Sequence, residues 1–216
     1  MRRISLGLLL IGLFTLTFIA PGAAQASKNE RYDFTVYLDD KHVGRHSFEI
    51  VDDGNVTRVL SNAQFKVTIL RIPVYRYEHN NAEQWSDNCL TGFDANTNAN
   101  GDRIEVSGEI TVDGFTVDHG NAAVNLPGCI MSFAYWNPDF LNESRLLNPQ
   151  TGEYVDVDVE VVGTETLEVR GEPVDARRFR LTAYEVDVTL WYSPDDEWLA
   201  LESVAEGGRI IRYELS

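Results

Sequence analysis

The chain has 216 residues and is strongly acidic, with 34 Asp and Glu against 18 Lys and Arg and a formal net charge of −16 at pH 7. This charge disfavours nucleic acid and anionic lipid headgroups as partners, because their phosphates would be repelled. The length and a hydrophobic share of 44% are typical of one globular domain with its own core.

The N-terminus has the three parts of a secretory signal peptide. Arg2 and Arg3 form a positive region, residues 4–20 are apolar, and Ala24–Ala26 supply the small residues of a cleavage site. We expect residues 1–26 to be removed, which places the mature protein in the periplasm and changes its formal net charge from −16 to −18. An uncleaved membrane anchor is the alternative, although the apolar run is short for a bilayer core of about 30 Å. After cleavage we expect a protein that does not span the membrane.

Residues 27–216 alternate between apolar and polar positions along most of their length. About eleven to thirteen such runs, separated by turn-forming residues, predict as many β-strands. Asp39-Asp40 and Asn100-Gly101 mark hairpin turns between runs, and Asn80-Asn81 marks a turn or a bulge. Because the connections are short and no run has the period of a crossover helix, we expect a single antiparallel β domain.

One helix is predicted, over residues 138–147. Asn137 is suited to cap it, Pro138 suits its first position, and Asn148-Pro149 would end it. The preceding segment, residues 127–137 (PGCIMSFAYWN), is rich in aromatic residues. A long twisted antiparallel sheet curls, and its concave side has to be filled. We therefore expect a mainly β fold, a β-clam or half-barrel, whose curved sheet wraps this segment and its short central helix.

Two cysteines are present, Cys89 and Cys129. In an oxidising compartment an even number of cysteines usually forms disulfides. Closing a loop of about 40 residues would stabilise the fold by about 4 kcal/mol. We predict a structural disulfide rather than a redox-active pair, because the spacing is not Cys-x-x-Cys.

Motifs for metal binding and catalysis are incomplete. Residues 94–102 (DANTNANGD) resemble a calcium loop, but Ser107 stands where a bidentate glutamate is needed. Nucleophile motifs such as Gly-x-Ser-x-Gly do not occur in the sequence. An enzyme would enclose His79 and Glu83 in one pocket with perturbed pKa values. The sequence favours a non-enzymatic protein without metal or cofactor, and leaves a hydrolase-like enzyme as an alternative.

Large aromatic residues are numerous for one small domain. Ordinary core packing is one explanation, and a concave pocket for an apolar or amphipathic ligand is the other. The candidate lining residues are Tyr75, Tyr77, Trp85, Phe133, Tyr135, Trp136 and Trp191, with His79 and Glu83 as polar contacts at the rim.

Segments along nearly the whole mature chain resemble a family of uncharacterised exported proteobacterial proteins, a domain of unknown function. The most specific segments are Phe133–Trp136 (FAYW), Asn148–Tyr154 (NPQTGEY) and Gly207–Tyr213 (GGRIIRY). The family is similar to periplasmic β-clam domains, in which an antiparallel sheet folds around a helix or cleft, and to envelope proteins that carry lipid or lipoprotein. The resemblance implies a β-clam fold and brings no established activity.

These observations favour a periplasmic, non-enzymatic β-clam protein that binds a hydrophobic or amphipathic ligand in its concave cleft. The ligand would be a lipid or another apolar small molecule. The alternative is an envelope structural or interaction module that binds an envelope protein through its acidic surface or a sheet edge. The identity of the ligand, the oligomeric state and the pathway do not follow from the sequence.

Overall fold

A computed structural model of the chain describes residues 28–69, 72–184 and 186–216, so the predicted signal peptide lies outside the described residues. The described residues form one antiparallel sheet of fourteen strands, one more than the upper end of the predicted range. The first eight strands are β1 (Lys28–Leu38), β2 (Lys41–Asp52), β3 (Thr57–Ile69), β4 (Ile72–Ser86), β5 (Cys89–Ala99), β6 (Asp102–Thr111), β7 (Gly114–Asp118) and β8 (Ala123–Leu126). The others are β9 (Arg145–Leu147), β10 (Tyr154–Val169), β11 (Glu172–Ala183), β12 (Val186–Tyr192), β13 (Trp198–Val204) and β14 (Ile210–Leu215).

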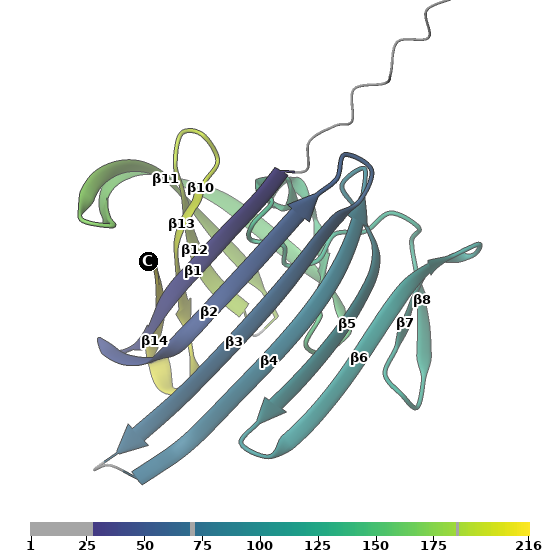
Figure 1. The fold of residues 1–216 in the computed structure, drawn as a ribbon, viewed down its shortest axis with the longest axis horizontal. Helices are drawn as coiled ribbons and strands as arrows, with labels where there is room; N and C mark the ends of the chain where they lie inside the picture. Colours follow the sequence, from purple (N-terminus) through teal and green to yellow (C-terminus); the bar gives the residue numbers. More distant parts are fainter. Residues whose placement is uncertain (1–27, 70–71, 185) are drawn as a thin grey trace, which may run out of the picture.

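The order of the strands shows how the chain folds back on itself. From one edge to the other the sheet runs β8-β7-β6-β5-β4-β3-β2-β1-β14-β13-β12-β11-β10-β9. The chain therefore starts in the middle of the sheet, runs as a meander to β8, crosses to β9 at the opposite edge, and returns to the middle. There β14 pairs with β1. Figure 1 shows β2 to β6 in front of β10 to β12, so the sheet curves back over itself.

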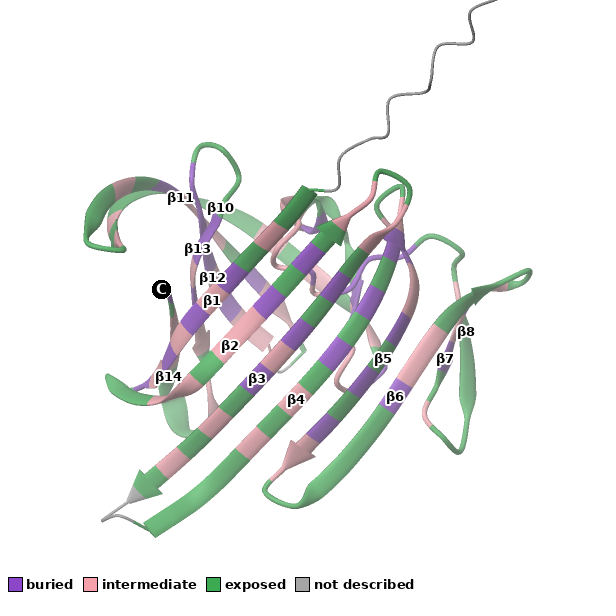
Figure 2. Cartoon of the chain, viewed as in Figure 1, coloured by how far each residue is buried: buried purple, intermediate pink, exposed green. Residues whose placement is uncertain are grey.

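The alternation of buried and exposed residues gives the sheet an inner and an outer face. In β1, Phe34 and Val36 are almost fully buried and the residue between them is not. Figure 2 shows the same alternation as bands along β1 to β4. Because successive side chains of a strand point to opposite faces, one face of each strand supplies the core. On that inner face the Phe34 ring lies 4.3 Å from the ring of Trp198, centroid to centroid.

The connection between β8 and β9, residues 127–144, fills the inside of the sheet, and we call it the crossing segment. Its residues Ile130 and Phe140 are buried, and Phe140 has no exposed surface. The ring of Tyr135 lies 5.5 Å from that of Trp198 on β13. The expectation that this ring-rich segment packs within the curved sheet is therefore confirmed.

A disulfide anchors the start of the crossing segment. Cys89 and Cys129 are bonded, with their Cα atoms 5.0 Å apart, as predicted. Next to this bond the backbone N–H of Leu90 donates to the carbonyl of Ile130 at 2.9 Å. The crossing segment is thus tied to the beginning of β5 by a covalent bond and a hydrogen bond.

The predicted central helix over residues 138–147 is wrong. Asn137 caps a short 3-10 helix, η1 (Pro138–Asn142), but the chain is extended again at Glu143. The following residues form β9, which pairs with β10. The edge of β10 offers unpaired backbone groups, and pairing with them outweighs the local helix signal. The other helix, η2 (Glu206–Gly208), is also short, and no helix in the described residues is long and apolar enough to cross a membrane.

Two of the predicted turns are confirmed and one is wrong. Asp39-Asp40 and Asn100-Gly101 form tight connections with positive φ angles, as their residue types favour. Asn80-Asn81 instead lies inside β4, and the turn after this strand is Asp87-Asn88, also with positive φ. In β4, Asn80 faces Asn62 of β3 and accepts a hydrogen bond from it, so a cross-strand pair replaces the expected turn.

Candidate functional site

The inner face of β4 carries a column of polar residues. Tyr77, His79, Asn81 and Glu83 are alternate residues of this strand and therefore share one face. Asn81 and Glu83 are buried, with 8% and 5% of their surface exposed, and the other two are half-buried. Polar groups taken out of water need hydrogen-bond partners, so the partners of this column define what it can do.

Glu83 connects β4 to the crossing segment. Its Oε1 accepts from Asn81 Nδ2 at 2.9 Å and from Ser132 Oγ at 3.0 Å, and its Oε2 accepts from Trp85 Nε1 at 2.9 Å. Burial raises the pKa of this carboxyl group, and the three donors oppose the shift because they favour the charged form. With both oxygens bonded, Glu83 acts as an anchor for the segment that fills the sheet.

Two histidines on β2 and β4, the strands on either side of β3, are kept neutral. His46 of β2 lies with Nε2 2.7 Å from Ser61 Oγ, and His79 lies with Nδ1 2.8 Å from Thr97 Oγ1. Burial lowers the pKa of His46 to about 3, and the nearby His79 adds to the effect. Burial also lowers the pKa of His79. Both rings are therefore uncharged at neutral pH and offer one donor and one acceptor each.

The polar column forms one wall of a half-open cavity of about 230 Å³ on the inner face of the sheet. The crossing segment forms the opposite wall, and β2, β3, β12 and the loop before β10 complete it. The lining residues are His46, Phe48, Val59, Ser61, Tyr77, His79, Asn81, Glu83, Phe133, Ala134, Tyr135, Trp136, Asn148, Pro149, Gln150 and Val186. The cavity thus combines aromatic and aliphatic side chains with polar groups.

Six of the nine predicted site residues line this cavity, namely Tyr77, Phe133, Tyr135, Trp136, His79 and Glu83. The other three do not. Tyr75 is 38% exposed, Trp85 is buried with its Nε1 bonded to Glu83, and Trp191 is buried on β12, where its Nε1 donates to Glu165. Of the two residues expected at the rim, Glu83 is buried and His79 is half-buried.

His79 and Glu83 do not form an acid–base pair. One cavity encloses both and the pKa of each is shifted, as an enzyme would require. However, they are four residues apart on one strand, about 13 Å along its axis. Each is bonded to other side chains, Glu83 to three donors and His79 to Thr97. Within residues 28–69, 72–184 and 186–216, no group of three or more His, Cys, Asp or Glu side chains is placed to hold a metal ion.

The relationship of the chain to known proteins follows from a match to one protein family. Residues 34–216 match the family described as Domain of unknown function (DUF6134). The chain belongs to this family. No curated protein matches the DUF6134 chain.

One solved structure similar to the DUF6134 chain is a β-barrel-like protein of domain of unknown function DUF1849 from Brucella abortus. The TM-score is 0.65 at 9% sequence identity, and the match covers 87% of this chain and 95% of that chain. At this identity the similarity shows the fold alone. The family match and this fold together bear out the prediction of an uncharacterised family with a β-clam-like fold.

Several cavity residues of the DUF6134 chain escaped the sequence analysis. Asn81 could have been predicted from the sequence, because it alternates with His79 and Glu83 and therefore shares their face of β4. No sequence pattern indicated His46 and Ser61, because only the register of β2, β3 and β4 places them beside this column. Their recognition required the tertiary structure.

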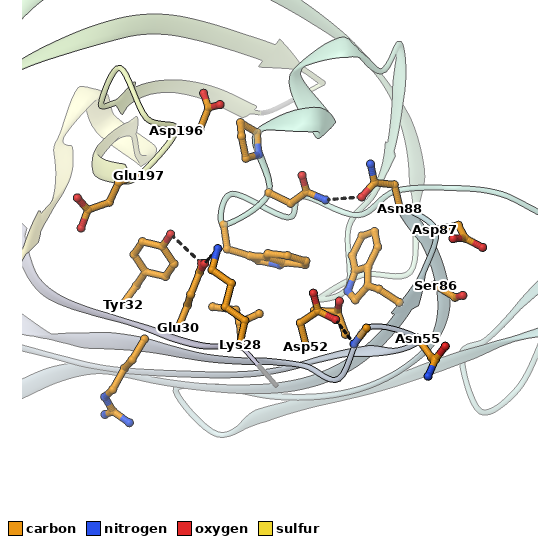
Figure 3. A pocket seen from close by; sticks show the side chains of 18 of the residues that line it. Lys28, Glu30, Tyr32, Asp52, Asn55, Ser86, Asp87, Asn88, Asp196 and Glu197 are labelled. Carbon is orange, nitrogen blue, oxygen red and sulfur yellow. Dashed lines mark hydrogen bonds and ion pairs between the residues drawn. The ribbon is translucent and has the colours of Figure 1, made fainter. Parts of the chain in front are cut away.

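A second, wider hollow of about 710 Å³ lies at the strand ends of the DUF6134 chain. Figure 3 shows acidic side chains around it, and Lys28 is paired with Glu30 there. Trp136 lines both hollows and packs edge-on against Trp85, with ring centroids 5.6 Å apart. Trp136 therefore stands between the acidic hollow and the half-open cavity. The acidic residues of the hollow are Glu30, Asp52, Asp87, Asp195, Asp196 and Glu197.

Proposed function

We propose that this DUF6134 protein is an exported, non-enzymatic binding protein that holds a small amphipathic molecule in the half-open cavity. The observation that carries the proposal is the cavity between β4 and the crossing segment, beside the packed core of the sheet. Ligand sites in proteins typically combine mostly apolar walls with a few placed polar groups. The cavity combines both kinds of group, with Phe133 and Tyr135 on one wall and the polar column of β4 on the other.

Two observations support export. The first 26 residues have the pattern of a cleaved signal peptide. The bond between Cys89 and Cys129 is of the kind that persists in oxidising compartments. Cell fractionation with N-terminal sequencing tests this part, and we expect a periplasmic protein that begins at Ser27. Recovery of the chain from the cytoplasm with residues 1–26 intact would contradict it.

Binding is tested with a variant that fills the cavity. Ala134 is 2% exposed and lines the cavity, so Ala134→Leu adds volume inside it. Ala82 is exposed and lies on the opposite face of β4 from the polar column, so Ala82→Leu is the matched control. The readout is native mass spectrometry of protein purified from its own envelope.

We expect the wild-type protein and Ala82→Leu to carry the same additional mass, and Ala134→Leu to lose it. Thermal unfolding of all three proteins establishes that each is folded. The same bound mass on a folded Ala134→Leu variant would place the ligand elsewhere. A wild-type protein that carries no additional mass and binds no added amphipath would contradict the proposed function.

The acidic hollow favours a second candidate, an envelope interaction module. Six carboxylates line this hollow against two cationic residues, Lys28 and Arg31. A positively charged protein surface would be attracted to it, and salt would weaken the attraction. Recovery of a stoichiometric protein partner that is lost in Asp87→Asn/Asp196→Asn and at high salt, with no small molecule bound, would favour this function over ligand binding.

A further inference from the structure

Two of the residues that line the cavity carry a buried side-chain atom without a hydrogen-bond partner. Asn81 Oδ1 is an acceptor on β4, and Trp136 Nε1 is a donor on the crossing segment. Asn81 is 92% buried, and its amide nitrogen is already used by Glu83. Leaving a buried donor or acceptor unpaired costs about 1–3 kcal/mol, so each atom favours a molecule that completes its bonding.

The charge of the cavity limits what that molecule is. None of its sixteen lining residues is Lys or Arg. His46 and His79 are neutral, and both oxygens of Glu83 are occupied by protein donors. A carboxylate or phosphate would therefore lose its hydration without gaining a cation. An ammonium group would find its natural partner, Glu83, already bonded.

The volume indicates how large a molecule, or part of a molecule, the cavity holds. A cavity of about 150 Å³ holds a benzene molecule, and sites for drug-sized ligands begin at about 300 Å³. The 230 Å³ of this cavity lies between these values. It suits a short aliphatic chain or a single ring with one head group.

We propose that the cavity selects a small amphipath with an uncharged head group that both donates and accepts hydrogen bonds, a hydroxyl or a primary amide. The head group donates to Asn81 Oδ1 and accepts from Trp136 Nε1. The apolar part lies against Phe48, Val59 and Val186. This inference rests on the proposed function and adds the chemical class of the ligand.

The test compares four probes that share one chain and differ only in the head group: octanol, octanamide, octanoate and octylamine. Each is titrated by calorimetry at about pH 7.5, where the acid and the amine are charged. The protein is the full mature chain, shown by native mass spectrometry to be free of bound molecules. We expect octanol and octanamide to bind at least about tenfold more tightly than the two charged probes, because a buried charge would be left unpaired.

The outcomes separate this inference from the proposed function. Equal binding of all four probes, or tighter binding of octanoate or octylamine, overturns the selection of an uncharged head group while leaving a binding cavity in place. Binding of none of the four probes, in a protein that also carries no mass from its own envelope, overturns the proposed function as well.

Neighbouring asparagines of β4 offer a matched pair of variants. Asn81→Leu removes the unpaired acceptor, and Asn80→Leu changes an exposed side chain on the opposite face of the same strand. We expect Asn81→Leu to reduce the preference for octanol over octanoate to less than about threefold, and Asn80→Leu to keep it. An unchanged preference in a folded Asn81→Leu variant contradicts the assignment.

Because Asn81 also donates to Glu83, its replacement perturbs the wall itself. Trp136→Phe is a second variant that removes the unpaired donor and keeps a smaller aromatic ring at this position. We expect it to weaken the binding of octanamide by about five- to tenfold and to remain folded in thermal unfolding, at a somewhat lower stability because the smaller ring leaves space beside Trp85. Unchanged affinity for octanamide in this variant removes Trp136 from the site.

Discussion

Replacing Glu83 with glutamine tests whether the buried carboxyl group anchors the crossing segment. Oε1 of Glu83 accepts from Asn81 and Ser132, and Oε2 accepts from Trp85. Glutamine keeps one acceptor oxygen and replaces the other by an amide nitrogen, which cannot accept. At least one buried donor loses its partner, so we expect the free energy of unfolding to fall by about 1–3 kcal/mol.

The loss of stability in Glu83→Gln is expected to become smaller as pH rises. Burial raises the pKa of Glu83 above its ordinary value of 4.5, so the folded protein binds this proton more tightly than the unfolded chain. This tighter proton binding contributes to the free energy of unfolding. The contribution is fully present below about pH 4.5 and declines as pH rises towards the pKa of Glu83 in the folded protein. The hydroxyl oxygen of a neutral acid still accepts a hydrogen bond. Because glutamine does not titrate, the difference between wild type and variant is widest at about pH 4 and narrows as pH rises.

Urea unfolding at about pH 4 and pH 7.5 measures both quantities. Glu78→Gln is the control, because Glu78 is exposed on the other face of the same strand. We expect this control to lie within about 0.5 kcal/mol of the wild-type protein. A Glu83→Gln variant as stable as the wild type at low pH, or a difference that widens as pH rises, would refute the reasoning.

Three further changes probe the framework around the cavity. Replacing Cys89 and Cys129 together by serine opens a loop closed across 40 residues and is expected to lower the free energy of unfolding by about 4 kcal/mol, measured by urea unfolding. Phe140→Ala removes a fully buried ring of the crossing segment and is expected to cost about 3–5 kcal/mol in the same assay, with loss of near-UV circular dichroism. In Gly44→Ala the new Cβ would lie 1.9 Å from the backbone oxygen of Gln64, so we expect a loss of at least about 3 kcal/mol or failure to fold, seen by far-UV circular dichroism.

Each of these changes has a control in the chain. A reducing agent added to the wild-type protein should reproduce the loss of the double cysteine variant, and no effect of either would contradict the anchoring role of the disulfide. Val161→Ala, at a residue 70% exposed, should change stability by less than about 0.5 kcal/mol, in contrast to Phe140→Ala. Gly92→Ala places its Cβ 3.6 Å from the nearest atom and should fold normally. Equal behaviour of the Gly44 and Gly92 variants would contradict the close approach of β2 to β3.

The candidate site shows where prediction from sequence stops. The aromatic residues Phe133, Tyr135 and Trp136 were predicted to lie inside the sheet because a ring-rich segment follows a long series of strands, and they line the cavity. Trp191 satisfied the same criterion of size and apolarity but packs elsewhere, with its Nε1 bonded to Glu165. Aromatic side chains are used in cores and in ligand sites alike, so their number does not identify which of them border a cavity.

Competition between local conformational preference and pairing with distant strands explains the incorrect helix and turn predictions. Residues 138–147 carry a good helix start, yet only Pro138–Asn142 form a turn of 3-10 helix, since the next residues meet the open edge of β10. Asn80-Asn81 favours a turn by residue type, yet the pair lies in a long strand with partners on both sides. In both cases a backbone partner distant in sequence outweighed a preference worth a fraction of a kcal/mol per residue.

The sequence by itself determined the strands, most of their turns and the disulfide, because these depend on alternation between neighbouring residues and on the pairing of two cysteines. Only the tertiary structure decided that β14 joins β1 and that β9 borders β10. It also decided that His46 and Ser61 share a wall with Asn81. These arrangements depend on which strand edges meet once the sheet has curved, and that curvature is a property of the whole sheet rather than of any segment.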